Sequence, residues 1–179
     1  DDVHLNKGKA ILTSNKHKTG SDRIFECFEK LDLKNIDYII NLQGDEPNID
    51  INDLKHLNKL VHINKPEIGT LGSEIKDKNS LNNENIVKVI TESKITDVNF
   101  PIAKDFKRKL KNLELNTYHH LGIYAYKPDI LKKIIKLKQT NNEIKNRLEQ
   151  LRAMENRIKI NVGLAKNCPI GIDTMEDYV

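Results

Sequence analysis

The chain has 179 residues, of which 37% are hydrophobic and 31% charged, and it contains no tryptophan. This length suits one α/β domain with a sizeable core of Ile, Leu and Val, and the composition is typical of a soluble globular protein. The net charge of +4 is modest, which argues against nucleic-acid binding. No apolar run is long enough to cross a bilayer. The amino terminus lacks a basic-then-apolar leader, so we expect a cytoplasmic protein.

Strand-like and helix-like patterns alternate along the chain, without an internal repeat or a linker. This alternation predicts one α/β domain that covers residues 1–179. We expect strands at residues 10–14, 37–42, 68–75, 86–91, 95–100, 119–126 and 158–164. We expect helices beginning near residue 21 and at Asp50 or Asn52, helices over 129–137 and 143–156, and a final one from Thr174. Residues 100–116 are polar and Lys-rich, which indicates an exposed excursion.

Both ends of the chain depart from the usual layout of such a domain. A nucleotide-binding α/β domain usually opens with a strand and a Gly-rich or basic phosphate loop, and the first residues of this sequence show neither. At the other end, the final helix pattern stops barely one turn in, at Val179. We therefore predict that this sequence lacks an N-terminal phosphate-loop segment and the end of its last helix. The two cysteines, Cys27 and Cys168, match no metal-ligand spacing and are expected to be free thiols.

The most informative stretch is the strand-like run from Tyr38 to Leu42 followed by Gln43-Gly44-Asp45-Glu46-Pro47. It presents carboxylates at the carboxyl end of a strand, which is the rim where open α/β sheets bind ligands. Asp173 follows another turn near the end of the chain. Taken singly, Asp45 and Asp173 are more typical of a cap or a backbone acceptor. Taken together, they predict a hard oxygen site suited to Mg²⁺.

Three further groups are candidates for binding. The turn Thr19-Gly20-Ser21-Asp22-Arg23 offers amides, hydroxyls and a guanidinium to a base, ribose or phosphate, although an ordinary helix cap explains it as well. His119 and His120 must face opposite sides of a strand, and one core and one surface histidine is the commoner outcome. Glu149 and Arg152 have the spacing of a solvated pair on a helix face.

Several runs, in this order, resemble the 3-deoxy-manno-octulosonate (Kdo) cytidylyltransferase family. The resemblance spans nearly the whole chain, and its combination of motifs is highly specific. The runs are Thr13-Ser14 with His17, Thr19 to Arg23, Asn41 to Pro47, His120-Leu121-Gly122-Ile123-Tyr124-Ala125-Tyr126, Leu148-Glu149-Gln150-Leu151-Arg152, and Gly171-Ile172-Asp173-Thr174-Met175-Glu176-Asp177.

The resemblance implies a three-layer α/β/α nucleotide-diphospho-sugar transferase-like fold, with a mostly parallel mixed sheet. It also implies an enzyme that transfers CMP from CTP to the anomeric hydroxyl of Kdo for lipopolysaccharide biosynthesis, releasing pyrophosphate. Asp45 and Asp173 would be the catalytic Mg²⁺ ligands, and a homodimer is expected. The CTP side would hold His17, Thr19, Gly20, Ser21, Arg23 and Gln43, and the sugar side His120, Tyr124, Glu149 and Gln150.

The sequence departs from the family in ways that keep other readings open. Besides the absent phosphate loop, the usual Phe-Ser-Arg run is missing, because Phe100 is followed directly by Pro101-Ile102. His119 stands where the family commonly has Arg, and Asn146 where it commonly has Glu. The alternatives are a cytidylyltransferase for another acidic sugar, such as an amino-substituted Kdo or a nonulosonate, and a non-catalytic nucleotide-binding relative. Without the phosphate loop, the 179 residues alone are expected to bind CTP poorly and to be inactive.

Overall fold

A six-stranded sheet forms the centre of the protein in the computed structural model, which describes residues 2–44, 46–75 and 78–167. Five strands follow the order β4-β3-β5-β2-β6, and β1 pairs with β5 beside this path. The strands are β1 (Ile39–Leu42), β2 (Ile68–Glu74), β3 (Lys88–Thr91), β4 (Ala103–Lys107), β5 (Thr117–Tyr126) and β6 (Ile160–Leu164).

Strand directions confirm the predicted mixed sheet. Strands β1, β2 and β3 each run antiparallel to β5, β4 runs antiparallel to β3, and β6 runs parallel to β2. Therefore β1, β2, β3 and β6 point one way, whereas β4 and β5 point the other way. Most strands share one direction, as expected, but among the described strands only the β2–β6 ladder joins parallel neighbours.

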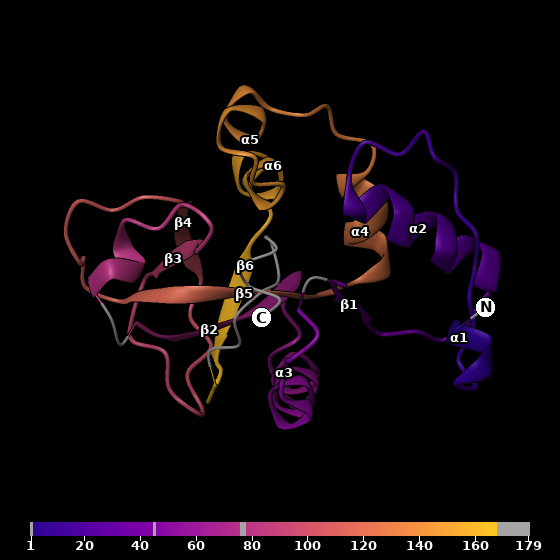
Figure 1. Ribbon diagram of the computed structural model, residues 1–179, viewed down its shortest axis with the longest axis horizontal. Helices are drawn as coiled ribbons and strands as arrows, with labels where there is room; N and C mark the ends of the chain where they lie inside the picture. Colours follow the sequence, from indigo (N-terminus) through magenta and orange to yellow (C-terminus); the bar gives the residue numbers. More distant parts are fainter. Residues whose placement is uncertain (1, 45, 76–77, 168–179) are drawn as a thin grey trace.

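Helices cover both faces of the sheet and give the three layers that the family resemblance implies (Figure 1). Helix α3 lies on one face, and α2, α4 and α6 lie on the other, with α5 beside α6. A short α1 buries no residue. The helices are α1 (Asp2–Leu5), α2 (Gly20–Leu31), α3 (Ile51–Asn64), α4 (Pro128–Ile134), α5 (Asn141–Asn146), α6 (Gln150–Glu155) and the 3₁₀ turn η1 (Lys78–Leu81).

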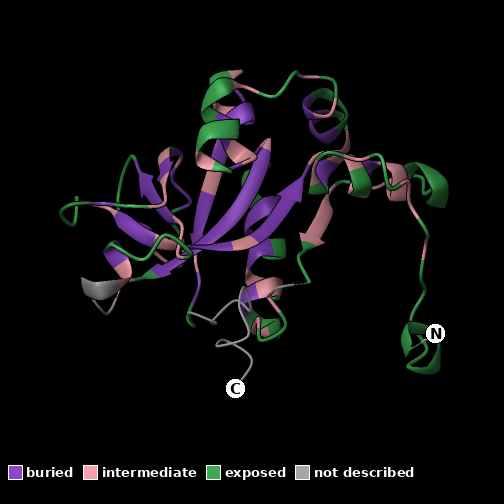
Figure 2. Ribbon diagram, turned by 45° about the horizontal axis from the view of Figure 1, so that its top comes forward, coloured by how far each residue is buried: buried purple, intermediate pink, exposed green. Residues whose placement is uncertain are grey.

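The long central strand β5 supplies side chains to both cores, because successive residues of a strand face opposite sides of the sheet. Leu121, Ile123 and Ala125 pack toward α3, whereas Tyr124 and Tyr126 pack toward the opposite helices. Buried residues are concentrated in the central strands and the faces that cover them (Figure 2). β5 therefore contributes buried side chains to the cores on both faces of the sheet.

Helix α3 lies very close to the sheet. As expected, Asp50 caps it by accepting a hydrogen bond from the Asn52 amide. Two glycines of the sheet make room for its apolar face. A Cβ atom on Gly69 would lie 2.6 Å from Val61 Cγ1, and one on Gly163 would lie 2.5 Å from Leu60 Cδ1.

The predicted strand at residues 10–14 is not formed. Within the described residues this segment pairs with no strand, and it runs instead along α2. Lys30 Nζ donates to the Leu12 carbonyl (2.8 Å) and Arg23 donates to Thr13 Oγ1 (2.6 Å). Leu12 is 92% exposed. The apolar pattern suited a strand, but a strand also needs a neighbouring ladder.

The predicted strand at 95–100 was wrong, and β4 lies in the region predicted to be an exposed excursion. Ile95 is buried, but its amide donates to the Tyr118 hydroxyl (3.0 Å) rather than to a ladder. The Asn99 side chain holds the loop by donating to Lys94 O (2.6 Å). Within the Lys-rich run, Ala103 and Phe106 are buried and pair with β3.

The single helix predicted over 143–156 is two short helices. Arg147 adopts a left-handed conformation with φ 52° and ends α5, so α6 begins afresh at Gln150. Leu148 and Leu151 are buried, as the pattern indicated. The helix predicted from Thr174 lies outside the described residues. Among the described helices, none combines the length and the apolar character needed to cross a bilayer.

Candidate functional site

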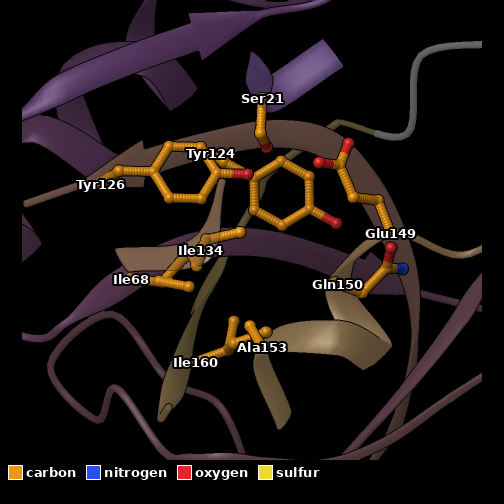
Figure 3. Close-up of a pocket in the computed structure, with 9 residues that line it drawn as sticks. All are labelled: Ser21, Ile68, Tyr124, Tyr126, Ile134, Glu149, Gln150, Ala153 and Ile160. Carbon is orange, nitrogen blue, oxygen red and sulfur yellow. The ribbon is translucent and has the colours of Figure 1, made fainter. Parts of the chain in front are cut away.

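A small pocket lies between β5, the start of α2 and the start of α6. Figure 3 shows the polar ends of its residues gathered on one side and apolar side chains on the other. Such a mixed lining suits a small polar ligand that also carries an apolar face. The polar lining residues are Ser21, Tyr124, Tyr126, Glu149 and Gln150, and the apolar ones are Ile68, Ile134, Ala153 and Ile160.

The predicted nucleotide turn reaches this pocket. Thr19 and Asp22 form a reciprocal capping box at the start of α2, which fixes the turn. Ser21 is buried in the lining, and its hydroxyl hydrogen-bonds the Tyr126 phenol. A Cβ atom on Gly20 would lie 3.9 Å from Glu149 Oε2. The turn is thus both a helix cap and one wall of the pocket.

Two other predicted nucleotide residues do not line the pocket: His17 lies on the segment that runs along α2, and Arg23 lies on α2 itself. His17 Nε2 contacts Glu26 Oε2, and the exposed Arg23 donates to Thr13. Glu26 also accepts a hydrogen bond from the Ser14 amide (3.0 Å) and pairs with Lys30 (2.6 Å). The Lys30 bond, followed by those from Ser14 and His17, lowers the pKa of Glu26 to about 2. Glu26 therefore anchors this segment to the helix.

His120 lies beside the pocket in a row of aromatic rings. Its ring centroid is 5.1 Å from that of Phe106 and 5.3 Å from that of Tyr124, and Tyr124 stacks on Tyr126 at 5.6 Å. Burial, with a smaller effect of His119, lowers the pKa of His120 to about 3. The imidazole is therefore neutral. His120 is the predicted core histidine.

The hydrogen bonds of Thr70 determine the tautomer of His120. The Thr70 hydroxyl donates to the Ile123 carbonyl (2.6 Å), and His120 Nε2 lies 3.0 Å from Thr70 Oγ1. Because the single hydroxyl proton is committed to Ile123, Nε2 carries the imidazole proton and donates to Thr70. The other ring nitrogen, Nδ1, is then an acceptor.

The tyrosine phenols are donors at neutral pH. Burial, the neighbouring Tyr126 and the Glu149 charge together raise the pKa of Tyr124, and burial followed by the Glu149 charge raises that of Tyr126. Both hydroxyls stay protonated. Tyr124 therefore offers a neutral hydroxyl next to the carboxylate of Glu149.

Glu149 and Gln150 stand at the start of α6 and line the pocket. The predicted solvated pair of Glu149 with Arg152 was wrong for Arg152, which is only 2% exposed and binds Glu143 through two hydrogen bonds. The sequence analysis missed Glu143. The pattern Thr140-x-x-Glu143 is a capping box, and it could have revealed a separate helix there.

The acidic rim after β1 is partly described. Gln43 is exposed just beyond the strand, and its Oε1 would lie 3.6 Å from a Cβ atom on Gly122. Glu46 Oε1 accepts a hydrogen bond from the Gly122 amide (3.2 Å). The two predicted Mg²⁺ ligands, Asp45 and Asp173, lie outside the described residues. Within the part of the chain that is described, no three His, Cys, Asp or Glu side chains cluster closely enough to hold a metal.

Comparisons with known proteins agree on one family. The sequence model of a family described as "Cytidylyltransferase" matches residues 1–160. The 3-deoxy-manno-octulosonate cytidylyltransferase of Thermodesulfovibrio yellowstonii is 42% identical over 180 residues, which is 95% of this chain and 71% of the relative. That of Bartonella bacilliformis is 37% identical over 175 residues, covering 93% of this chain and 69% of the relative.

Solved structures give the same result for the fold. The structure of a CMP:2-keto-3-deoxy-manno-octonic acid synthetase complexed with CTP superposes with a TM-score of 0.82 at 31% identity, covering 96% of this chain and 70% of that chain. An apo UDP-glucose pyrophosphorylase superposes with a TM-score of 0.65 at 14% identity, covering 99% of this chain and 63% of that chain, which supports the fold alone.

Proposed function

We propose that this chain, which belongs to the 3-deoxy-manno-octulosonate cytidylyltransferases within the cytidylyltransferase family, transfers CMP from CTP to the anomeric hydroxyl of Kdo. The sugar oxygen forms a new bond to the α-phosphorus, the bond to the β-phosphate oxygen breaks, and pyrophosphate leaves. The observation that carries the proposal is the pocket, in which Ser21 of the nucleotide turn meets Tyr124, Glu149 and Gln150 of the expected sugar side. Its product would serve lipopolysaccharide biosynthesis.

The described side chains suit a polyhydroxylated ligand. Glu149 and neutral His120 Nδ1 accept hydrogen bonds from hydroxyls, Tyr124 donates one, and Gln150 can do both. On the nucleotide side, Thr19, Gly20 and Ser21 offer hydroxyls and amides from one turn. Gln43 extends this side at the end of β1. His17 would contribute from the segment that Glu26 anchors, and Arg23 from α2 beside it. These residues hold and orient two substrates, which is the main requirement of phosphoryl transfer.

We also propose that Asp45 and Asp173 hold Mg²⁺. Carboxylate oxygens are the ligands that this ion prefers, and Asp45 is flanked by Glu46, whose hydrogen bond to Gly122 ties the rim to β5. Bound Mg²⁺ neutralises charge on the triphosphate. The chain is further expected to act as a homodimer in the cytoplasm.

The test is pyrophosphate release by the full-length gene product with CTP, Mg²⁺ and Kdo. Asp45→Ala and Asp173→Ala should each lower the rate by about 10² or more. Asp97→Ala is the matched control, because Asp97 is an exposed loop residue. Full activity in both aspartate variants would refute the metal assignment. Amino-substituted Kdo and a nonulosonate should be tested in competition, since preference for either would reassign the sugar.

A further inference from the structure

We infer that Arg152 is a positioning residue whose buried guanidinium sets the orientation of Glu149 relative to the turn at Thr19 to Asp22. It would thereby hold the sugar side of the pocket against the nucleotide side. This inference rests on the proposed function for what the pocket binds. Its structural basis is one buried guanidinium that contacts two carboxylates, those of Glu143 in α5 and of Glu149 at the start of α6.

The first step is the pair that fixes Arg152. Arg152 and Glu143 are 2% and 3% exposed. Arg152 Nε donates to Glu143 Oε2 (2.9 Å), and Nη2 donates to Oε1 (2.5 Å). Two parallel bonds of this kind fix the plane of the guanidinium as well as its place. The hydrogen bond with Glu143 raises the pKa of Arg152, so the positive charge is permanent.

The pair also joins two helices that are too short to be stable alone. Helices α5 and α6 have six residues each, well below the length at which an isolated helix persists in water. Arg147, in its left-handed conformation, separates them. The Glu143–Arg152 contact connects α5 to α6 across this break, and it therefore fixes where α6 starts.

The start of α6 is where Glu149 meets the pocket. Glu149 Oε1 lies 3.9 Å from Arg152 Nη2, and this oxygen is buried without a hydrogen-bond partner among the described residues. The other oxygen, Oε2, faces Gly20 of the turn. The carboxylate thus lies between the guanidinium and the turn. Because no hydrogen bond holds Oε1, attraction to Arg152 is the interaction that orients it.

The turn itself experiences the same charge. Asp22, which closes the capping box of α2, is among the carboxylates that stabilise the charged form of Arg152. The reciprocal hydrogen bonds of the capping box already hold the turn, so Arg152 acts mainly on the sugar side, through Glu149. Glu149 lines the pocket, where its carboxylate can accept hydrogen bonds from a ligand.

The main test separates the two substrates kinetically. Arg152→Lys keeps the charge but loses the planar fork, and it should raise the sugar KM roughly tenfold while the CTP KM changes by less than about twofold. Glu155→Gln is the matched control, because Glu155 is exposed on the same helix, and it should leave both KM values unchanged. Equal effects on both substrates, or no effect on the sugar, would overturn the inference.

A second variant removes the risk of misfolding. Glu143→Met with Arg152→Met replaces the buried pair by apolar side chains, a change that cores often tolerate. This double variant should fold, yet it should show a sugar KM at least as high as that of Arg152→Lys. If it folds and binds the sugar normally, Arg152 has no positioning role.

A double-mutant cycle tests whether Arg152 acts through Glu149. If it does, adding Glu149→Gln to Arg152→Lys should raise the sugar KM by no more than about twofold further. Independent roles would give multiplied effects and would refute the inference. The same four proteins should show non-additive urea midpoints, whether or not catalysis is observed. If the wild-type protein were inactive but the urea midpoints of the four proteins were non-additive, the proposed function would be rejected. The coupling of Arg152 and Glu149 would still stand.

Discussion

The Glu46 carboxylate accepts a hydrogen bond of 3.2 Å from the amide of Gly122, which lies 76 residues further along the chain. This contact fills a gap between two ladders on one edge of β5. Strand β3 pairs with residues 117–119, and β1 pairs with residues 123–126. The Gly122 amide falls between them, so a side chain from the acidic rim supplies an acceptor that neither strand provides.

Removing this acceptor should loosen the rim. Glu46→Ala leaves the Gly122 amide without its acceptor, which should lower the free energy of unfolding by about 1–3 kcal/mol. It should also reduce the rate of pyrophosphate release by roughly tenfold, because Asp45, the proposed Mg²⁺ ligand, directly precedes Glu46 in the chain. Glu46→Gln keeps a side-chain oxygen and serves as the control in urea unfolding and in the assay. Equal loss in both variants would show that the charge, rather than the hydrogen bond, matters.

The Glu26 anchor should affect nucleotide binding. Glu26→Ala releases His17 and the Ser14 amide from α2, so the CTP KM should rise roughly fivefold while the sugar KM stays the same. Steady-state kinetics with each substrate varied would measure this. Glu29→Ala provides the comparison, since Glu29 is an exposed carboxylate of the same helix. An unchanged CTP KM would mean that His17 and its segment do not contribute to binding.

The buried His120 should make stability depend on pH. Burial lowers the pKa of His120 to about 3 in the folded protein, whereas an unburied histidine has a pKa of 6.5. The unfolded chain therefore takes up a proton below pH 6.5 that the folded protein does not. The free energy of unfolding should consequently fall as the pH drops from 6.5 toward 3. Nearby His119, with its pKa lowered to about 4 mainly by burial, acts in the same direction.

Urea unfolding at pH 7, 6 and 5 can measure this dependence. In His120→Gln the slope with pH should be shallower than in the wild type, and His119 should account for part of what remains. The stability advantage of the wild type over His120→Gln should therefore shrink as the pH falls. If this advantage were the same at all three pH values, His120 would not be buried in its neutral form.

Close packing of α3 on the sheet predicts intolerance at Gly163. Gly163→Ala would place a Cβ atom 2.5 Å from Leu60 Cδ1 and 3.1 Å from Leu71 Cδ2, and both leucines are buried. Overpacking of this kind should cost about 1–3 kcal/mol of the free energy of unfolding. In Gly44→Ala the new Cβ atom would have no atom of the described residues within 4 Å, so the urea midpoint of this variant should be close to that of the wild type. A wild-type midpoint in Gly163→Ala would mean that α3 can shift away from the sheet.

Much of the fold could be predicted from sequence where local pattern and tertiary environment agree. The capped amphipathic helix α3 and the strongly apolar β5 are examples. Prediction failed where the decisive partner is remote. Residues 10–14 have strand character without a ladder, and Ile95 is buried through a bond to Tyr118 rather than within a strand. The Lys-rich run was predicted to be exposed because of its polar composition, yet Phe106 pairs with β3 and the run forms a strand there.

The candidate site was predictable in its residue types but not in its connections. The motifs led to Ser21, Tyr124, Glu149 and Gln150, which line one pocket. They did not reveal the buried ion pair beneath it, because Arg152 was interpreted as the solvated partner of Glu149 and Glu143 was not recognised. Their burial depends on a break at Arg147, and a left-handed conformation at a non-glycine residue leaves no reliable mark in the sequence. The roles of Asp45 and Asp173 stay predictions.

The pairing of β1 with β5 has a consequence for folding during synthesis. Ile39 lies opposite Tyr126, so most of the chain must leave the ribosome before this ladder can close. Until then the acidic rim has no Gly122 amide to bind, and the row of tyrosines that forms the pocket is missing. Ladders between such distant segments form slowly because the intervening loop loses entropy. The nascent chain therefore assembles this pocket among the last of its tertiary contacts.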